Sequence, residues 1–232
     1  MKYILTYVLV LVISSFPAQA QVSQEQKPQA QVSFLGDLAV LNRVKPQQNP
    51  KYERARDILD RRVLDRRSRV IGEVRDVVVD RGGTVSSLLV VFNRLHLKQE
   101  VFLNYNDLSV KGGYDDYELA LLREDVRDMY PQLLANIETA AGDDDLLSLR
   151  NVKGTWLYNA HGKKLGRITD VLFSSDGRRA EAIYAEIDYG SLRDVGVAIP
   201  FNAAMFREKR GRLQAVLGPQ ESTQLVDFAK RL

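Results

Sequence analysis

The sequence contains no cysteine among its 232 residues, and it has only two histidines, His96 and His161. The lack of cysteine excludes disulfides, thiolate-bound zinc, iron–sulfur clusters and a cysteine nucleophile. It also excludes a lipoprotein anchored through an acylated cysteine. Two histidines are too few for a multi-histidine metal site. Composition therefore argues against an enzyme, and we expect no catalytic residue, metal, cofactor or small-molecule substrate.

A strong excess of one charge is also missing. The chain has 33 basic and 30 acidic residues, which gives a net charge of +3. This small excess gives no argument for a nucleic-acid partner, and we expect none. Hydrophobic residues make up 45% and charged residues 27%, a globular rather than a disordered composition. The length fits one large domain or two small ones.

The N-terminal apolar run is too short to span a bilayer. It extends from Ile4 to Ile13 and is broken only by Thr6, whereas a spanning helix needs about 20 apolar residues. Lys2 precedes the run, and small residues close it at Ala18-Gln19-Ala20. This is the layout of a secretory signal peptide over residues 1–20. We expect cleavage after Ala20 and export to the periplasm or the medium; the alternative is an uncleaved anchor.

Residues 21–50 are expected to be a flexible tail and linker. The segment from Gln21 to Gln31 is rich in glutamine and poor in large apolar residues, so it cannot stabilise an ordered structure of its own. Residues 32–44 contain scattered hydrophobic side chains, which predict docking on a domain or a short helix. Two prolines within residues 45–50 predict a turn or linker before the first domain.

The rest of the chain contains an internal repeat. Five pairs share a constant spacing of 94 residues: Gly72 and Gly166, Val74 and Ile168, Asp76 and Asp170, Val77 and Val171, and Gly83 and Gly177. A later β-rich run also recurs, from Val101 to Asn106 and from Val197 to Asn202. The period is too long for a solenoid, so it predicts two homologous small domains.

Each copy is expected to consist of short strands joined by glycine turns. The predicted strands cover residues 70–79, 85–92, 100–105, 108–110 and 117–122, and then 155–158, 165–173, 182–187, 195–200 and 212–217. Turns are expected at Gly82-Gly83 and Asp176-Gly177. Helices are predicted over residues 123–130, ending at Pro131, and over residues 219–232. Strands of this length and spacing suggest a small closed or nearly closed barrel in each copy.

The repeated pattern, Gly-x-Val/Ile-x-Asp-Val followed by a glycine turn and a Val/Ile-Pro-Phe/Tyr element, resembles the PRC-barrel family. The residues that carry it are Gly72, Val74, Asp76 and Val77 in the first copy, and Gly166, Ile168, Asp170, Val171, Ile199, Pro200 and Phe201 in the second. The first copy has Asn104 where the family often has proline. The resemblance covers about residues 59–130 and 151–232. Similar barrels occur in photosynthetic reaction-centre H subunits and in a ribosome-maturation factor, where they hold other macromolecules.

The resemblance implies a mainly β protein with two small PRC-type β-barrels and short accessory helices, after a cleaved signal peptide and a disordered tail. We place the first domain at residues 51–130 and the second at 150–232. Residues 131–149 are expected to be a helical connector and an acidic linker. Leu133, Leu134, Ile137 and Ala141 have the spacing of one helical face, which must be buried against the barrels. The barrels should therefore pack together as a pseudo-symmetric pair.

Asp76 and Asp170 are the most informative polar residues, because each interrupts a β-rich stretch at the same repeat position. A catalytic role would need a second carboxylate or a base nearby, and none recurs in both copies. The alternative is that each carboxylate accepts hydrogen bonds from backbone N–H groups of a neighbouring turn. We favour this structural role, which groups them with Gly72, Gly83, Gly166, Gly177 and Pro200.

The densest basic stretch is a candidate patch for an acidic partner or anionic lipid headgroups. The candidate residues are Arg61, Arg62, Arg66, Arg67 and Arg69. Acidic residues interleave with these arginines at Glu53, Asp57, Asp60 and Asp65. The alternative is therefore an ion-paired helix surface without a binding role, and we favour that interpretation.

Three functions remain open on the sequence. The leading hypothesis is an exported, non-enzymatic adaptor that uses tandem PRC-barrel-like domains to hold a protein partner in the bacterial envelope. The second is a membrane-complex subunit similar to reaction-centre H subunits, which would need a retained N-terminal membrane helix. The third is a small carboxylate-dependent hydrolase, which would need Asp76 or Asp170 in a pocket with another carboxylate.

Overall fold

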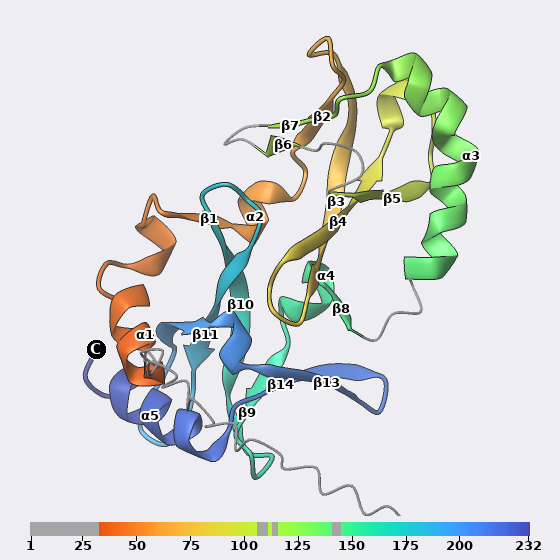
Figure 1. The fold of residues 1–232 in the computed structure, drawn as a ribbon. Helices are drawn as coiled ribbons and strands as arrows, with labels where there is room; N and C mark the ends of the chain where they lie inside the picture. The colour runs from red at the N-terminus through yellow and green to blue at the C-terminus, as the bar shows by residue number, and fades with distance from the viewer. Residues whose placement is uncertain (1–32, 106–110, 113–115, 141–144) are drawn as a thin grey trace, which may run out of the picture. The chain divides into compact units, whose positions relative to one another are not determined.

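The computed structural model describes residues 33–105, 111–112, 116–140 and 145–232 (Figure 1). The predicted signal peptide, the predicted tail up to residue 32, the strand expected at 108–110 and the connector residues 141–144 lie outside the described residues, as do the side chains of residues 136–140. Among the described residues, no helix combines the length and the apolar character needed to cross a membrane.

The protein is mainly β, and its described residues form two sheets of seven strands each. The first sheet has the order β5-β4-β3-β2-β7-β6, with β8 also paired to β3. Its pairs are antiparallel except for the parallel pair of β2 and β7. Its strands are β2 (Arg62–Leu64), β3 (Val70–Asp80), β4 (Val85–Val91), β5 (Glu100–Asn104), β6 (Lys111–Gly112), β7 (Asp116–Glu118) and β8 (Leu146–Ser148).

The second sheet repeats this arrangement. Its order is β12-β11-β10-β9-β14-β13, with β1 also paired to β10, and its one parallel pair among the described residues is β9 with β14. Its strands are β1 (Tyr52–Arg54), β9 (Trp156–Tyr158), β10 (Lys164–Ser174), β11 (Ala180–Ile187), β12 (Val195–Pro200), β13 (Met205–Lys209) and β14 (Arg212–Val216). The predicted internal repeat is therefore present in the strand order itself.

The long strands β3 and β10 show the repeat at single-residue resolution. Each has 11 residues, and each has a break in register one residue before its aspartate, between Val74 and Asp76 in β3 and between Ile168 and Asp170 in β10. A bulge of this kind bends a strand and redirects the neighbouring side chains. The two aspartates are thus presented by the same local geometry.

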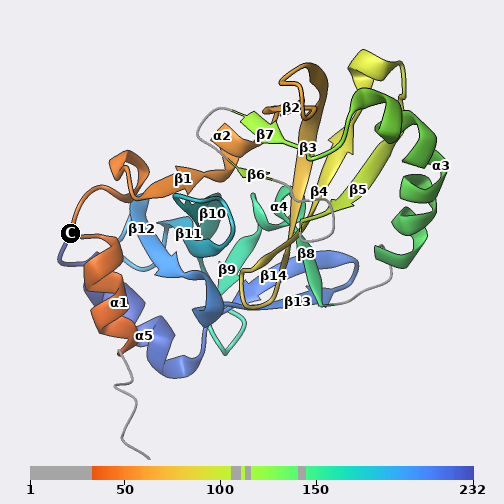
Figure 2. The same ribbon diagram turned by 45° about the horizontal axis from the view of Figure 1, so that its top comes forward.

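The two halves of the chain exchange their first strands. β1 precedes the first sheet in sequence, yet it pairs with β10 of the second, with Tyr52 opposite Ser174 and Arg54 opposite Leu172. β8 begins the second half, yet it pairs with β3 of the first sheet, where Ser148 lies opposite Val78. Both exchanged strands attach near the end of the long strand (Figure 2). The sequence analysis predicted that the halves would pack together, but not that they would exchange strands.

The helices follow the same exchange. α1 (Phe34–Leu41) packs on β12 and on α5 (Pro219–Ala229), and α3 (Arg123–Ala140) packs on β5. α1 precedes the first half of the chain and covers the second sheet, whereas α3 precedes the second half and covers the first sheet. The helix predicted at Pro219 is confirmed, and within residues 32–44 the expected docking and the short helix are both present as α1. Residues 34–41 are therefore not part of the flexible tail expected over residues 21–50. The structure also contains the short helical turns α2 (Ala55–Ile58) and α4 (Leu149–Val152), and the 3-10 turns η1 (Pro46–Gln48), η2 (Asn93–Leu95) and η3 (Phe201–Ala203).

The prediction that a helix ends at Pro131 is wrong, because Pro131 lies inside α3. A proline removes one intrahelical hydrogen bond and crowds the preceding turn. Here the proline is exposed, and the helix continues because Leu133 is buried and Leu134 packs against the same core. Burial of this apolar face offsets the local cost of the proline.

One side chain fixes the N-terminal helix to the second sheet. Asn42, at the end of α1, donates from Nδ2 to the carbonyl of Ala198 and accepts from the Ala198 N–H, both at 2.8 Å. The amide thus satisfies both main-chain groups of one residue on the edge strand β12, as a neighbouring strand would. Leu38 and Leu41 of α1 are buried on this side.

Candidate functional site

A large hollow lies beside the hairpin of β13 and β14. Its volume is about 1570 Å³, and it is lined from three places: the tip of the β3–β4 hairpin at Arg81, the segment around β8 and α4, and strands β9, β10, β13 and β14. Residues from both halves of the chain therefore form one concave surface, which the exchanged strand β8 helps to build.

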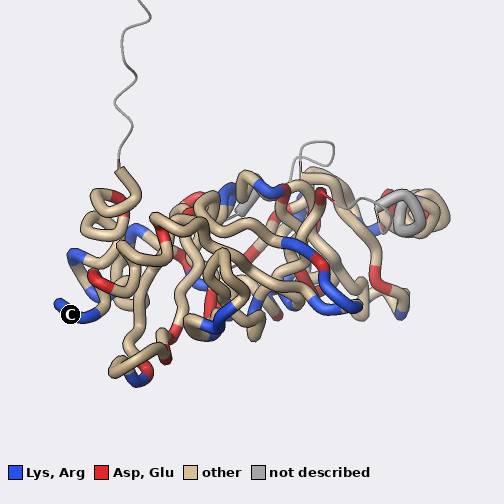
Figure 3. Tube along the Cα trace, turned by 90° about the horizontal axis from the view of Figure 1, so that it is seen from below, with Lys and Arg blue, Asp and Glu red and all other residues tan. Residues whose placement is uncertain are grey.

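The hollow is strongly basic. Its lining includes Lys153, Lys164, Arg167, Arg207, Lys209, Arg210 and Arg212. None of these cations forms an ion pair with a carboxylate in the described part of the chain. Glu208 is the one acidic residue among the described lining residues. Figure 3 shows Lys and Arg along the hairpin with a single acidic break. An unpaired cluster on a concave surface creates a positive potential that attracts anions.

The single tryptophan of the chain lies in this hollow. Trp156 is 42% exposed, and Lys164 Nζ lies 3.9 Å from the centre of its ring, with the Arg167 guanidinium 5.9 Å away. Cations over an indole ring are stabilised by its electron-rich face. Trp156 therefore holds two of the basic side chains in place while remaining accessible itself.

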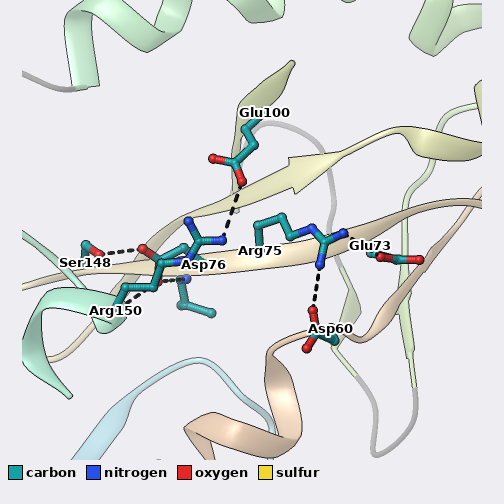
Figure 4. Close-up of polar contacts among 8 residues, drawn as sticks. Asp60, Glu73, Arg75, Asp76, Glu100, Ser148 and Arg150 are labelled. Carbon is teal, nitrogen blue, oxygen red and sulfur yellow. Dashed lines mark hydrogen bonds and ion pairs between the residues drawn. The ribbon is translucent and has the colours of Figure 1, made fainter. Parts of the chain in front are cut away.

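The two halves meet at Asp76, which accepts hydrogen bonds from the other half (Figure 4). The Ser148 hydroxyl donates to Asp76 Oδ2 at 2.5 Å, and the Arg150 N–H donates to Oδ1 at 3.2 Å. The Val77 N–H also donates to Oδ1, at 2.8 Å. The Arg150 guanidinium, in turn, contacts Glu100 on β5. Asp76 therefore anchors the exchanged strand β8 and the turn that follows it.

Asp170 has the equivalent role in the second sheet. It accepts from the Val171 N–H at 3.0 Å, as Asp76 does from Val77, and from Nε of Arg54 at 2.8 Å. Arg54 is the last residue of the exchanged strand β1. Asp170 is 2% exposed, so the pair is largely shielded from water. Both aspartates thus accept the N–H of the next residue in their own strand, rather than N–H groups of a neighbouring hairpin turn as expected. Their other donors come from the exchanged strands and the turn that follows β8.

The tips of the two long hairpins also pair with each other. The Ala180 N–H donates to the Gly83 carbonyl at 2.7 Å, and the Val85 N–H donates to the Arg178 carbonyl at 2.9 Å. Gly83 and Gly177 have positive φ angles of 89° and 68°. A Cβ on Gly83 would lie 2.5 Å from the Ala180 carbonyl oxygen, so the two turns approach too closely for a side chain there.

A buried ion pair lies beneath these turns. Arg61 pairs with Glu53 of β1, and both side chains are buried. Burial raises the pKa of the Glu53 carboxyl, and the neighbouring Arg61 opposes that shift. Burial likewise raises the pKa of the nearby tyrosines Tyr105 and Tyr117. The arrangement joins an exchanged strand to the first sheet and exposes no charge to a partner.

Comparison with protein families decides what kind of protein this is. The PRC-barrel domain matches the chain twice, over residues 50–120 and over residues 144–216. The chain belongs to the PRC-barrel family. A comparison with curated proteins gave no match. The two matched segments correspond to the two repeats, and each PRC-barrel domain begins with the strand that it gives to the other domain's sheet.

The remaining motif residues of the two PRC-barrel domains are structural. Gly72 and Gly166 lie at equivalent positions in β3 and β10, where a carbonyl of the neighbouring strand leaves no room for a Cβ. Pro200 ends β12 opposite Ala182 and begins the turn η3. Within the described residues, no group of acidic residues or histidines has the geometry of a metal site.

The predicted arginine patch is not a single surface. Arg61 is only 8% exposed and paired with Glu53, so it cannot contribute to a patch, and this part of the prediction is wrong. Arg62 pairs with Asp116, and Arg69 pairs with Asp65 and Glu124. Arg66 and Arg67 remain exposed. The stretch also does not form one continuous helix surface, since it contains only the short helical turn α2 between the strands β1 and β2.

Sequence reasoning missed the basic hollow of the second PRC-barrel domain. The best local signal was the run Arg207-Glu208-Lys209-Arg210-Gly211-Arg212, in which a glycine turn is surrounded by basic residues. The other contributors, Lys153, Lys164 and Arg167, come from separate strands and turns. Only the fold brings them together, and the nearly balanced net charge of the whole chain concealed the cluster.

Proposed function

We propose that the protein is an exported, non-enzymatic adaptor whose tandem PRC-barrel domains hold an acidic macromolecular partner in the bacterial envelope. The observation that carries this proposal is the basic hollow with its unpaired cations around Trp156. A protein with acidic side chains is the partner whose charge it complements. The secretory layout of residues 1–20 supports export after cleavage behind Ala20.

The contacts of the two repeat aspartates support a non-enzymatic role. Both Asp76 and Asp170 accept hydrogen bonds from donors that join the two domains. A hydrolase would need one of these carboxylates in a pocket beside a second carboxylate. Neither aspartate lines the basic hollow. The adaptor proposal therefore accounts for these residues better than the hydrolase alternative.

The direct test compares two pairs of arginines in capture experiments with envelope extracts. The first variant is Arg207→Gln with Arg212→Gln, which removes two cations from the hollow. The matched control is Arg66→Gln with Arg67→Gln, which removes the same charge from another exposed surface. We expect the wild type and the control to retain an acidic protein that the hollow variant loses. Equal capture by all three proteins, or none by any, would contradict the proposal.

Export is tested separately by N-terminal sequencing of the protein recovered from the envelope fraction. A sequence starting at Gln21 supports the secretory signal. A sequence that retains residues 1–20, in a membrane pellet, would favour the reaction-centre-H-like alternative instead.

A further inference from the structure

The strand β13 forms one edge of the second sheet and borders the basic hollow. It pairs with β14 on one side, and the described strand order ends with it. Residues 206–210 of this strand and its turn are among those that line the hollow. An edge strand has free main-chain N–H and carbonyl groups, and these can pair with another extended chain.

Two independent observations identify the outward-facing residues. The Leu217 N–H donates to the Tyr158 carbonyl of β9, so in β14 the residues of odd number face β9 and those of even number face β13. The even-numbered residues of β14 pair with Met205, Arg207 and Lys209, so the main-chain groups of these three residues bond to β14. The main-chain N–H and carbonyl groups of Phe206 and Glu208 therefore face outward. In agreement, the Phe206 carbonyl accepts a hydrogen bond from Arg81, which lies outside the sheet.

The outward groups of Glu208 are available. No described residue forms a hydrogen bond with the Glu208 N–H or carbonyl outside β13. Arg207 and Lys209 are exposed and lie opposite Gln214 and Arg212 on one face of the hairpin. Side chains of neighbouring strands on the same face interact directly. A chain added to β13 would therefore place every second side chain beside these cations.

We propose that β13 binds an extended acidic segment of a partner protein as an added β-strand, with acidic residues at alternate positions. This inference rests on the adaptor function proposed above and specifies how the partner is held. Main-chain hydrogen bonds to Glu208 supply a general affinity, and the alternating basic side chains supply the preference for acid. The site is a hollow of about 1570 Å³, and a single extended chain fits such a concave surface better than a flat lipid surface does.

The test uses the full mature chain and a labelled synthetic peptide of about eight residues, in which glutamate alternates with threonine or valine. A second peptide of the same composition carries its glutamates consecutively. Binding is measured by fluorescence anisotropy at low salt. We expect the alternating peptide to bind at least about tenfold more tightly, because only it places its acids on one face of the added strand.

The decisive variant is Glu208→Pro, and its matched control is Glu208→Gln. Both remove the same negative charge, but only proline removes the outward N–H, and an edge strand tolerates proline at such a position. We expect Glu208→Pro to weaken peptide binding about tenfold or more, because an acceptor of the peptide loses its partner. Glu208→Gln should bind as tightly as the wild type or more tightly. Unchanged thermal midpoints confirm that both variants fold.

A measurement on the wild type makes the test independent of the proline variant. Hydrogen exchange of the Glu208 amide should slow when the alternating peptide is added, whereas the Arg207 amide, already bonded to β14, should change little. No slowing at Glu208 despite peptide binding would overturn strand addition.

The outcomes also separate this inference from the adaptor function. If Arg207→Gln with Arg212→Gln abolishes binding while Glu208→Pro does not, the hollow holds an acidic partner but not as an added strand. If neither peptide binds and the chain instead sediments with vesicles of phosphatidylglycerol, both proposals are wrong and the surface binds anionic lipid.

Discussion

Asp76 and Asp170 occupy the same bulge in two sheets, and each accepts donors from a segment of the other domain. Their surroundings differ in one respect. Asp76 receives a hydroxyl and two N–H groups, whereas Asp170 receives one N–H and the charged Arg54 side chain. A buried carboxylate that loses a charged partner leaves an uncompensated charge, which is more costly than the loss of a neutral bond. The two repeat positions therefore differ in how much their contacts contribute to stability, and we expect the larger contribution at Asp170.

The first prediction concerns that charged contact. We expect Asp170→Asn to lower the free energy of unfolding by about 3 kcal/mol, because Arg54 is left largely buried without its anion. The control Asp227→Asn removes an exposed partner of Lys230 and should cost no more than about 1 kcal/mol. Urea unfolding followed by circular dichroism measures both. Equal small effects would show that the Arg54 contact adds nothing to stability.

The second prediction concerns the response to acid at Asp65. Burial alone would raise the pKa of this carboxyl, but hydrogen bonds from the Arg69 side chain and from the N–H groups of Arg69 and Arg67 outweigh burial and lower the pKa below its usual 3.8. A depressed pKa contributes stability that is full above pH 3.8 and is lost as the pH falls through the folded-state pKa.

Asp65→Asn should therefore flatten the dependence of unfolding free energy on pH below about 4, while lowering stability at pH 7. Asp37→Asn, in the partly exposed first turn of α1, provides a control with the same charge change. Parallel pH profiles for the wild type and Asp65→Asn would contradict this assignment.

At the scale of elements, periodicity located the longer strands and also the three-residue strand β9 (Trp156–Tyr158), but it missed β1, β2, β8 and β13. β3, β4, β10, β11 and β12 alternate or run apolar over six or more residues. The strands β1, β2 and β8 have three residues each, and β1 includes Glu53 and Arg54. A segment of three residues shows little periodicity, and the partners of β1 and β8 lie in the other domain.

The third prediction concerns the paired turns. Gly83→Ala should destabilise the protein by about 2 kcal/mol or more, because alanine is strained at positive φ and its Cβ would press on the Ala180 carbonyl. Gly162→Ala is the matched control: φ is 77° there, but the surrounding space is open. Gly162→Ala should lower the free energy of unfolding only through the strain of alanine at positive φ, by about 1 kcal/mol. Thermal melting compares the two, and equal losses would mean that contact between the turns contributes no stability.

At the scale of the whole molecule, exchanged strands make the two domains mutually dependent. One continuous cluster of buried side chains includes Leu103 of the first sheet and Ile199 of the second. The ion pair and hydrogen bonds at Asp76 and Asp170 also cross between the domains. Neither domain keeps a complete set of strands without the other, so partial unfolding would expose apolar surface and sheet edges in both.

The fourth prediction follows from this dependence. Trp156, the single tryptophan, reports on the second domain alone. Leu103→Ala leaves a cavity beside the first sheet and should lower the free energy of unfolding by about 2–5 kcal/mol. The midpoint of the Trp156 fluorescence transition should shift by the same amount as that of the circular dichroism transition. A Trp156 midpoint that stays at the wild-type value would show that the domains unfold independently.

The repeat, the family and most of the longer strands could be predicted from the sequence, because they depend on local patterns: alternating apolar residues, glycine turns and a motif that recurs at 94 residues. It also singled out Asp76 and Asp170, whose carboxylates accept backbone N–H groups in the structure. Three features became visible only in the folded chain: which domain each first strand joins, the continuation of α3 through Pro131, and the place where the unpaired cations gather. These outcomes depend on contacts between residues far apart in the chain, and such contacts leave no periodic trace in the sequence.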